Sequence, residues 1–513
     1  MDRPIRVGGG VGEGRVAGPD RSGVDGRPGR RRWGWLLAAA CLSVAAGLVA
    51  LGLVDGRLTR RAAHKVGRVV FHIADRSAPA GTVPARVRPV TLTPTADWTT
   101  YHGDAARSGV ARGSPALRHP QPGWTSAALD QPVYGQPLVV GGRALVATEG
   151  DSVYALDERS GALLWRTKLG EPIAGGSLPC GNIDPVGITS TPVADPAAGL
   201  LYAVAFLDPD HPHHELVALD LGSGAVRFRR PADPPGADPR VQNQRGAMVL
   251  ANGRVYVAFG GRYGDCGRYH GWVVGLPASG DGPMVSFRVP TAREAGIWAP
   301  AGPVVDHRGG LLVATGNGAS STHYDEGSSV LRLTADLHQL DAFAPPDWAE
   351  LSRADADLGS VNPTLVGDEL VFQVGKAGVG YLLSAAHLGG IGGQRFSGQV
   401  CQAAFGATAS RPPLVYVPCV DGLVALRVAT EPAPAFRVAW RSARFNAGPP
   451  IVAAGAVWTL DQDTGTLLAF DPATGQARGR VRVGPAAHFA APSAAGGLVL
   501  IAAGRQVTAV TMG

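Results

Sequence analysis

Lysine is almost absent from this chain of 513 residues, and charged residues of both signs make up only 17% of it. The three lysines are Lys65, Lys168 and Lys376, so nearly all of the formal net charge of +6 comes from arginine. Much of this arginine lies near the N-terminus, and no basic patch interleaved with aromatic residues follows it. The composition therefore argues against nucleic acid as a partner.

Long apolar runs are also scarce, and only Trp33–Val54 is long enough to cross a bilayer, which takes about 20 residues. This run predicts a transmembrane helix, and the arginines at 30–32 favour a cytoplasmic N-terminus. We expect a single-pass membrane protein with its larger part on the extracytoplasmic side. The expected segments are a disordered cytoplasmic segment at 1–32, the helix at 33–54, a juxtamembrane segment with a Pro/Thr-rich linker at 55–96, and one folded domain at 97–513.

The 72 glycines and 41 prolines are typical of many short strands joined by turns. Residues Ala144–Gly170 show three short strands and two turns, with apolar residues alternating along each strand. The same unit returns at Val457–Val483, where Asp471–Gly475 stands in the place of the hairpin turn Asp157–Gly161. Two copies so far apart in the chain indicate a repeat architecture.

The strand units recur at about 35–50 residues, which is the period of propeller blades. The expected first strands of the blades lie at 136–140, 190–194, 246–250, 302–306, 362–366, 405–409, 448–452 and 491–494. The last unit lacks an outer strand, and the segment around Trp124 supplies one. We therefore predict an all-β fold, an eight-bladed β-propeller of four-stranded antiparallel blades whose ring is closed by an N-terminal strand, with seven blades as the alternative.

Four stretches resemble the propellers of the pyrroloquinoline quinone (PQQ) type. Val153–Trp165 and Leu468–Gly475 resemble the repeat of that family, and Trp98–Gly109 resembles the segment that opens such domains. Ile297–Gly318 resembles a stretch from the middle of the propeller. The resemblance implies the fold from Trp98 to the C-terminus, whereas it says little of function because the repeat consists of packing and turn residues.

Enzymes of this family hold PQQ with a calcium ion and use an aspartate as base, so the resemblance implies a dehydrogenase of alcohols or sugars as one function. Asn317 stands where the family supplies a calcium ligand, although Thr-Gly-Asn-Gly is also an ordinary turn. Leu333 stands where the base is expected, and neither an adjacent cysteine pair nor a Cys-x-x-Cys-His haem motif is present. We therefore expect no catalytic residue, no metal and no cofactor. The expected function is that of a scaffold that binds a ligand or protein, and the alternative is a dehydrogenase that uses PQQ and calcium.

Four cysteines follow the apolar run: Cys180, Cys266, Cys401 and Cys419. Their even number predicts two disulfides and an oxidising compartment, and four cysteines allow three pairings. Cys401 precedes the first strand of one blade and Cys419 ends its second strand, so the two can meet. Cys180 precedes the first strand of one blade and Cys266 follows the second strand of the next, on the same face. We predict the pairs Cys180–Cys266 and Cys401–Cys419.

That face also collects unusual polar and aromatic residues. The candidates are Asn182, Asp184, Asp265, His270, Trp298, Asn317 and Lys376. These loops either seal the central channel or form a binding site for a protein or small-molecule ligand. Lys376 lies among glycines that lack the full spacing of a phosphate-binding loop.

Two further segments allow a local prediction. His213, His214 and Glu215 could hold a metal, but an exposed hairpin loop is the simpler interpretation. Residues 347–358 have helical propensity with Trp348, Leu351 and Leu358 on one side, which predicts an insertion that covers the rim of the ring.

Overall fold

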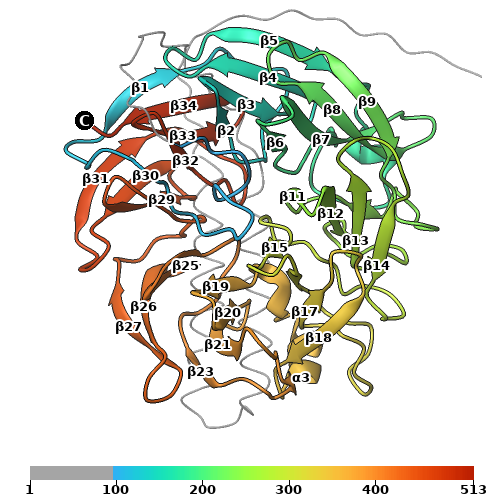
Figure 1. The fold of residues 1–513 in the computed structure, drawn as a ribbon, viewed down its shortest axis with the longest axis vertical. Coiled ribbons are helices and arrows are strands. Elements are labelled where there is room, and N and C mark those ends of the chain that lie inside the picture. Colours follow the sequence, from blue (N-terminus) through green and yellow to red (C-terminus); the bar gives the residue numbers. More distant parts are fainter. Residues whose placement is uncertain (1–95) are drawn as a thin grey trace, which may run out of the picture. The chain divides into compact units, whose positions relative to one another are not determined.

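The computed structural model describes residues 96–513, which form eight sheets arranged in a ring, each built on four antiparallel strands (Figure 1). The prediction of an all-β, eight-bladed propeller is confirmed. The predicted cytoplasmic segment 1–32, the predicted membrane helix 33–54 and nearly all of 55–96 lie outside the described residues. Within 96–513, no helix has the length and apolar character that crossing a membrane requires.

The first four blades follow one another along the chain. Blade 1 contains β2 (Leu138–Val140), β3 (Arg143–Ala147), β4 (Ser152–Asp157) and β5 (Leu163–Lys168). Blade 2 contains β6 (Val193–Asp195), β7 (Leu200–Leu207), β8 (His213–Asp220) and β9 (Val226–Pro231). Blade 3 contains β11 (Val249–Ala251), β12 (Arg254–Gly261), β13 (Trp272–Pro277) and β14 (Val285–Arg288), with β10 (Gln242–Asn243) also paired to β12. Blade 4 contains β15 (Val304–Val305), β16 (Leu311–Ala314), β17 (Val330–Leu333) and β18 (Gln339–Ala344), with β22 (Gly390–Ile391) added outside.

The remaining blades complete the ring. Blade 5 contains β19 (Thr364–Val366), β20 (Leu370–Val374), β21 (Val379–Ser384) and β23 (Phe396–Gln399). Blade 6 contains β24 (Ala409–Arg411), β25 (Leu414–Cys419), β26 (Gly422–Ala429) and β27 (Ala435–Arg441). Blade 7 contains β28 (Ile451–Ala453), β29 (Ala456–Asp461), β30 (Thr466–Phe470) and β31 (Ala477–Arg482). Blade 8 contains β32 (Ser493–Ala495), β33 (Leu498–Ala503), β34 (Gln506–Thr511) and β1 (Gln121–Thr125). The helical segments within residues 96–513 are η1 (Gly175–Ser177), α3 (Trp348–Ala354) and η2 (Leu358–Ser360).

The inner strands begin two to four residues later than predicted, because the residues before them belong to the loops that line the channel. The N-terminal strand closes the ring as expected: β1 pairs with β34, with Gln121 opposite Thr511 and Thr125 opposite Thr508. Trp124 is buried, and its Nε1 donates to the carbonyl of Glu158 in blade 1 at 2.8 Å. Closure removes two open sheet edges that would otherwise invite aggregation.

The central channel is filled by the chain's own segment 98–110, which sequence reasoning did not place. Trp98 pairs with Val139 of blade 1, and Val110 pairs with Val452 of blade 7. Between these contacts, Arg107 is 1% exposed and donates to the carbonyls of Pro303 and Met248 at the inner strands of blades 4 and 3. This channel segment therefore ties opposite sides of the ring together.

Both predicted disulfides are confirmed: Cys180 pairs with Cys266 and Cys401 with Cys419. Because the strands of each blade alternate in direction, the turns between second and third strands lie on the same face as the connections between blades. All four cysteines lie in or next to these loops, so both bridges brace one face of the ring.

Candidate functional site

The loops on the braced face converge where the chain enters the inner strands. Tyr101 packs with Ala247, Ala301, Ala407 and Ala491, which directly precede the inner strands of blades 3, 4, 6 and 8. A few residues earlier in the same connections stand Arg245, Trp298, Phe405 and Phe489, which contact one another through Phe489. Contacts between blades so far apart in the ring place these side chains over the channel, and we call this region the channel mouth.

An ion-pair network lies on one side of the channel mouth, and we call it the Lys376 cluster. It consists of Trp298, Asn317, Asp355, Asp357 and Lys376. The Lys376 Nζ is 2.8 Å from Asp355 Oδ1 and 3.4 Å from Asp357 Oδ1. Trp298 Nε1 donates to the second oxygen of Asp357 at 3.2 Å, and Asn317 Nδ2 donates to Asp355 at 2.9 Å. Loops of the neighbouring blades 4 and 5 thus meet in one hydrogen-bonded group.

Burial and ion pairing together determine which groups of the Lys376 cluster are protonated. The Asp357 side chain is 4% exposed, and burial raises its pKa above the usual 3.8, with Lys376 opposing the shift. Burial also disfavours the Lys376 ammonium, but the carboxylates of Asp357 and Asp355 outweigh it and raise its pKa, so the lysine stays protonated. Within residues 96–513 the Asn317 Oδ1 is buried without a hydrogen-bond partner, whereas the Asp357 Oδ1 lies in the ion pair with Lys376. Such orphaned acceptors are costly unless water or a ligand satisfies them.

Aromatic rings and one arginine form the opposite side of the mouth. The Arg245 guanidinium lies 5.4 Å from the centre of the Tyr134 ring and 5.5 Å from that of Phe489, and its Nη2 donates to the carbonyl of His488 at 2.7 Å. Within residues 96–513 no carboxylate forms an ion pair with Arg245, and burial lowers its pKa. The Phe489 ring also stands 6.3 Å from Trp298 and 6.1 Å from Phe405. Glu149 acts on Arg245 electrostatically but forms no ion pair with it in the described residues, and a cation flanked by rings without an ion-paired carboxylate favours an anionic guest.

The floor and walls of the mouth are rigid. Tyr101, at the tip of the channel segment, is 2% exposed, and its buried hydroxyl has no hydrogen-bond partner among residues 96–513. The turn that carries Lys376 is held from the side, because Val400 and Cys401 both donate their backbone N–H to Gly378. The Cys401–Cys419 bridge therefore braces this turn, and Cys180–Cys266 braces the loop that carries Asp265.

The structure brings together only part of the predicted face. Trp298, Asn317 and Lys376 meet in the Lys376 cluster. Asp265 instead accepts a hydrogen bond from the Tyr269 hydroxyl at 2.6 Å, and the carbonyl of His270 accepts one from Gln242. Asp184 accepts a hydrogen bond from the backbone of Gly175 within its own connection, and Asn182 lies two residues before it.

One local prediction was wrong, and a second was correct for only part of its range. His213–Asp220 is a strand rather than a loop, and His214 is buried, with its Nδ1 2.7 Å from Asp233. The helix expected at 347–358 ends at Ala354, because Asp355 adopts a left-handed conformation with φ 53°. This left-handed turn brings the carboxylates of Asp355 and Asp357 within reach of the Lys376 ammonium.

The acid at the mouth was the main residue that sequence reasoning missed. Leu333, assigned to the position of the family's base, is buried in β17, whereas Asp357 stands beside Trp298. The position of Asp357 in the sequence could have identified it as a residue of the mouth, because it precedes the inner strand of a blade, as Trp298 does. The same rule applies to Tyr134, Arg245, Phe405 and Phe489, all of which precede inner strands and line the mouth.

Comparisons with known proteins agree with this architecture. The family model described as outer membrane protein assembly factor BamB matches residues 121–266. A polyvinylalcohol dehydrogenase of Sphingopyxis sp. (strain 113P3) is 26% identical over 227 residues, which are 39% of this chain and 32% of that protein. One of Pseudomonas sp. is 25% identical over 221 residues, with the same coverage. The alignments thus span about a third of the length of these relatives.

Solved structures share the fold over most of the chain. A quinohemoprotein alcohol dehydrogenase from Comamonas testosteroni superposes with a TM-score of 0.60 at 16% identity, covering 82% of this chain and 81% of that one. A europium-containing methanol dehydrogenase gives a TM-score of 0.60 at 14% identity, covering 80% and 90%. At such low identity the similarity concerns the fold alone.

Proposed function

We propose that this PQQ-type β-propeller protein binds a planar, anionic organic ligand at its channel mouth, without a metal ion and without catalysis. The observation that carries the proposal is Arg245, a guanidinium set between two aromatic rings without an ion-paired carboxylate in the described part of the chain. The half-buried Trp298 ring and the Lys376 ammonium, 5.6 Å from the centre of that ring, add a stacking surface and a second cation.

Calcium does not fit the residues of the mouth. The ion takes six to eight oxygen ligands at about 2.3–2.6 Å. Between Asp355 and Asp357 stands the Lys376 ammonium, and Asn317 turns its nitrogen, not its oxygen, toward Asp355. Within the described residues, one group of three side chains lies close enough to hold an ion, namely Cys401, Cys419 and Asp421, and two of these are joined in a disulfide.

Pyrroloquinoline quinone itself does fit the proposed ligand class, because it is planar and carries several carboxylates. Trp298 would offer a face for stacking, and Arg245 and Lys376 would offer charge-assisted hydrogen bonds. The orphaned oxygen of Asn317 supplies an acceptor for an N–H or O–H of the ligand. When bound, such a quinone could accept electrons from a substrate, but the proposed role requires binding only.

The second candidate is a dehydrogenase of alcohols, and Asp357 favours it. A buried carboxyl group with a raised pKa, held by Trp298 next to the proposed ligand position, has the environment of a general base. The relatives that bear the name polyvinylalcohol dehydrogenase point the same way. This candidate predicts oxidation of polyvinyl alcohol or a secondary alcohol by the protein supplied with PQQ and calcium, measured with an artificial electron acceptor.

Replacing Arg245 tests the binding proposal. In the full-length protein, Arg245→Met should weaken the binding of PQQ by about 10- to 100-fold, because charge-assisted hydrogen bonds contribute about 1.5–3 kcal/mol. Titration calorimetry measures the loss. Arg482→Met, which changes an exposed arginine of β31, serves as the control and should leave the affinity unchanged. Equal affinity of the Arg245 variant and the wild type would remove the basis of the proposal.

We also propose that the propeller is anchored to a membrane by the segment 33–54 and lies on the extracytoplasmic side. The two disulfides support an oxidising compartment, since such bonds persist outside the cytosol. In intact cells, a membrane-impermeant thiol probe should label the propeller only after its disulfides have been reduced, and carbonate washing should leave the full-length chain in membranes. Recovery of the chain in the soluble cytosolic fraction with free thiols would contradict this topology.

A further inference from the structure

At three junctions between neighbouring blades, a tryptophan of one blade's outer strand docks on the next blade. Trp124, Trp165 and Trp440 each lie against the turn between the third and fourth strands of the next blade. Their indole N–H groups donate to the carbonyls of Glu158 at 2.8 Å, Leu221 at 3.2 Å and Pro472 at 2.9 Å, respectively. A glycine in each turn gives the ring room, as a Cβ there would come within 2.3–2.6 Å of the indole. The chain thus contains three copies of an indole docked on a blade turn.

Blade 2 carries Phe228 where these tryptophans stand. Its ring lies against Gly280 in the corresponding turn of blade 3, and a Cβ on that glycine would be 3.0 Å from the ring. The phenyl ring has no N–H to donate. The carbonyl that corresponds to the three acceptors is that of Ala278, the first residue after β13. The junction between blades 2 and 3 therefore has the carbonyl acceptor of Ala278 but no indole N–H that donates to it.

The junction between blades 6 and 7 shows what is missing. There the carbonyl of Pro472 accepts two hydrogen bonds, one from the Tyr416 hydroxyl at 3.2 Å and one from Trp440 Nε1 at 2.9 Å. At the blade 2 junction the Tyr202 hydroxyl donates to the carbonyl of Ala278 at 2.9 Å, in the same way as Tyr416. Among the described residues, Tyr202 is the single side chain that donates to Ala278, so one acceptor position remains for an outside N–H.

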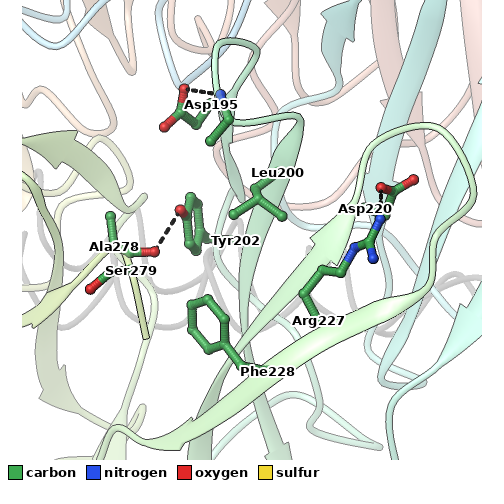
Figure 2. A pocket seen from close by; sticks show the side chains of 9 residues that line it. Asp195, Leu200, Tyr202, Asp220, Arg227, Phe228, Ala278 and Ser279 are labelled. Atoms are coloured by element: carbon green, nitrogen blue, oxygen red, sulfur yellow. Dashed lines mark hydrogen bonds and ion pairs between the residues drawn. The ribbon is translucent and has the colours of Figure 1, made fainter. Parts of the chain in front are cut away.

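A cavity of about 480 Å³ opens at this position (Figure 2). Figure 2 shows the Tyr202 and Phe228 rings beside Leu200 and the Tyr202 hydroxyl directed at the carbonyl of Ala278. The volume falls within the range of about 300–1,000 Å³ that is usual for ligand sites. The turn between third and fourth strands lies on the face opposite to the channel mouth, so this site is distinct from the mouth.

The rim of the cavity carries one carboxylate that is not part of an ion pair in the described residues. Asp220 is neutralised by an ion pair with Arg227. Asp195 accepts hydrogen bonds from the backbone of Ala197 and Ala198, and within residues 96–513 no cation pairs with it. A guest with a positive charge near its aromatic group would satisfy this carboxylate.

We propose that the cavity is a docking pocket for a tryptophan side chain of a partner polypeptide, flanked by a basic residue. The indole N–H donates to the carbonyl of Ala278, the ring packs on Phe228 and Leu200, and the basic side chain faces Asp195. The arrangement repeats between two chains what Trp440 does within this one. Aromatic anchors in such pockets commonly dominate protein–protein recognition.

Two tripeptides test the pocket with the full-length protein. Lysyl-tryptophyl-lysine should bind, as measured by titration calorimetry, and lysyl-phenylalanyl-lysine should bind on the order of fivefold more weakly, because it lacks the N–H that a neutral hydrogen bond needs. Equal affinity for the two peptides would overturn the proposal.

Two variants locate the binding. Phe228→Trp should place the chain's own indole at the junction, raise the melting temperature and abolish binding of the tryptophan peptide. Phe287→Trp, in the outer strand of blade 3, is the matched control and should keep the binding. Asp195→Asn keeps the oxygen that accepts the hydrogen bonds of the turn. It should weaken the binding of the lysine-containing peptide severalfold and leave the binding of neutral N-acetyltryptophanamide unchanged. Wild-type affinity in both Phe228→Trp and Asp195→Asn would show that the peptide binds elsewhere.

Discussion

Arg107→Met is expected to lower the free energy of unfolding by about 3 kcal/mol or more, although the site lies outside every blade. Arg107 is 1% exposed, and its guanidinium donates to the carbonyls of Pro303, Tyr101 and Met248 at 2.9–3.3 Å and to the Thr100 hydroxyl. Methionine fills much of the volume but leaves the buried carbonyls of Pro303 and Tyr101 without the donors that Arg107 supplies, each at a cost of about 1–3 kcal/mol, whereas the Met248 carbonyl keeps a hydrogen bond from the Thr100 hydroxyl. Urea denaturation of the purified protein measures the change.

Arg112→Met is the control for this substitution, because Arg112 lies on the same segment of the chain but is exposed. It should unfold within about 0.5 kcal/mol of the wild type, as surface substitutions usually do. If Arg107→Met also stayed within that margin, the channel segment would not be the structural tie between opposite blades that the hydrogen bonds indicate.

Glu149→Gln is expected to change how stability depends on pH. Glu149 is 1% exposed, and burial raises its pKa from 4.5 to about 7, although hydrogen bonds from Gly187 and Thr189 oppose the shift. The folded protein therefore holds this proton more tightly than the unfolded chain does. The stabilisation is complete below pH 4.5 and is lost as the pH rises through about 7, which amounts to about 3 kcal/mol at about 1.4 kcal/mol per pKa unit.

Glutamine is neutral throughout, so the variant should lose much less stability between pH 5 and pH 8 than the wild type does. Asp151, whose pKa burial also raises, adds a residual dependence of the same sign. Urea midpoints at the two pH values give the comparison, and Glu369→Gln, at an exposed position, should behave as the wild type. Parallel pH profiles of wild type and Glu149→Gln would mean that Glu149 does not carry the effect.

Ionisation of Glu149 should also affect ligand binding at the channel mouth, because the Glu149 carboxylate acts electrostatically on the Arg245 guanidinium. Above pH 7 the carboxylate reduces the net positive potential around the guanidinium. An anionic ligand should therefore bind more weakly at pH 8 than at pH 6, and Glu149→Gln should flatten this difference.

The sequence predicted the features that repeat. The Asp–Gly turns Asp157–Gly161 and Asp471–Gly475 mark blades 1 and 7, because an aspartate oxygen accepts the backbone N–H groups of the turn while glycine takes a positive φ. Trp124 could be assigned to the last blade because the blade otherwise lacked its outer tryptophan. Cysteine pairing followed once the blade register was known.

The features that occur once were harder to predict. The channel segment 98–110 has no strand periodicity, since its backbone bonds to several blades in turn rather than to one neighbour. Asp355 and Asp357 follow a helical pattern in sequence, and only the left-handed turn at Asp355 brings them to Lys376. The pocket at Phe228 could not be predicted from the sequence repeat, because Phe228 keeps the aromatic character of the position. The missing indole N–H is recognised only in the structure, where the carbonyl of Ala278 lies beside the ring.

The central claim is that the channel mouth binds a planar anion without a metal ion. Its most direct test is calorimetric titration of the purified full-length protein with PQQ, once in EDTA and once in millimolar calcium, followed by an alcohol oxidation assay on the same samples. The account predicts the same saturable affinity in both buffers and no oxidation of alcohol. Binding that appears only with calcium and is accompanied by turnover would contradict it and identify the protein as a dehydrogenase.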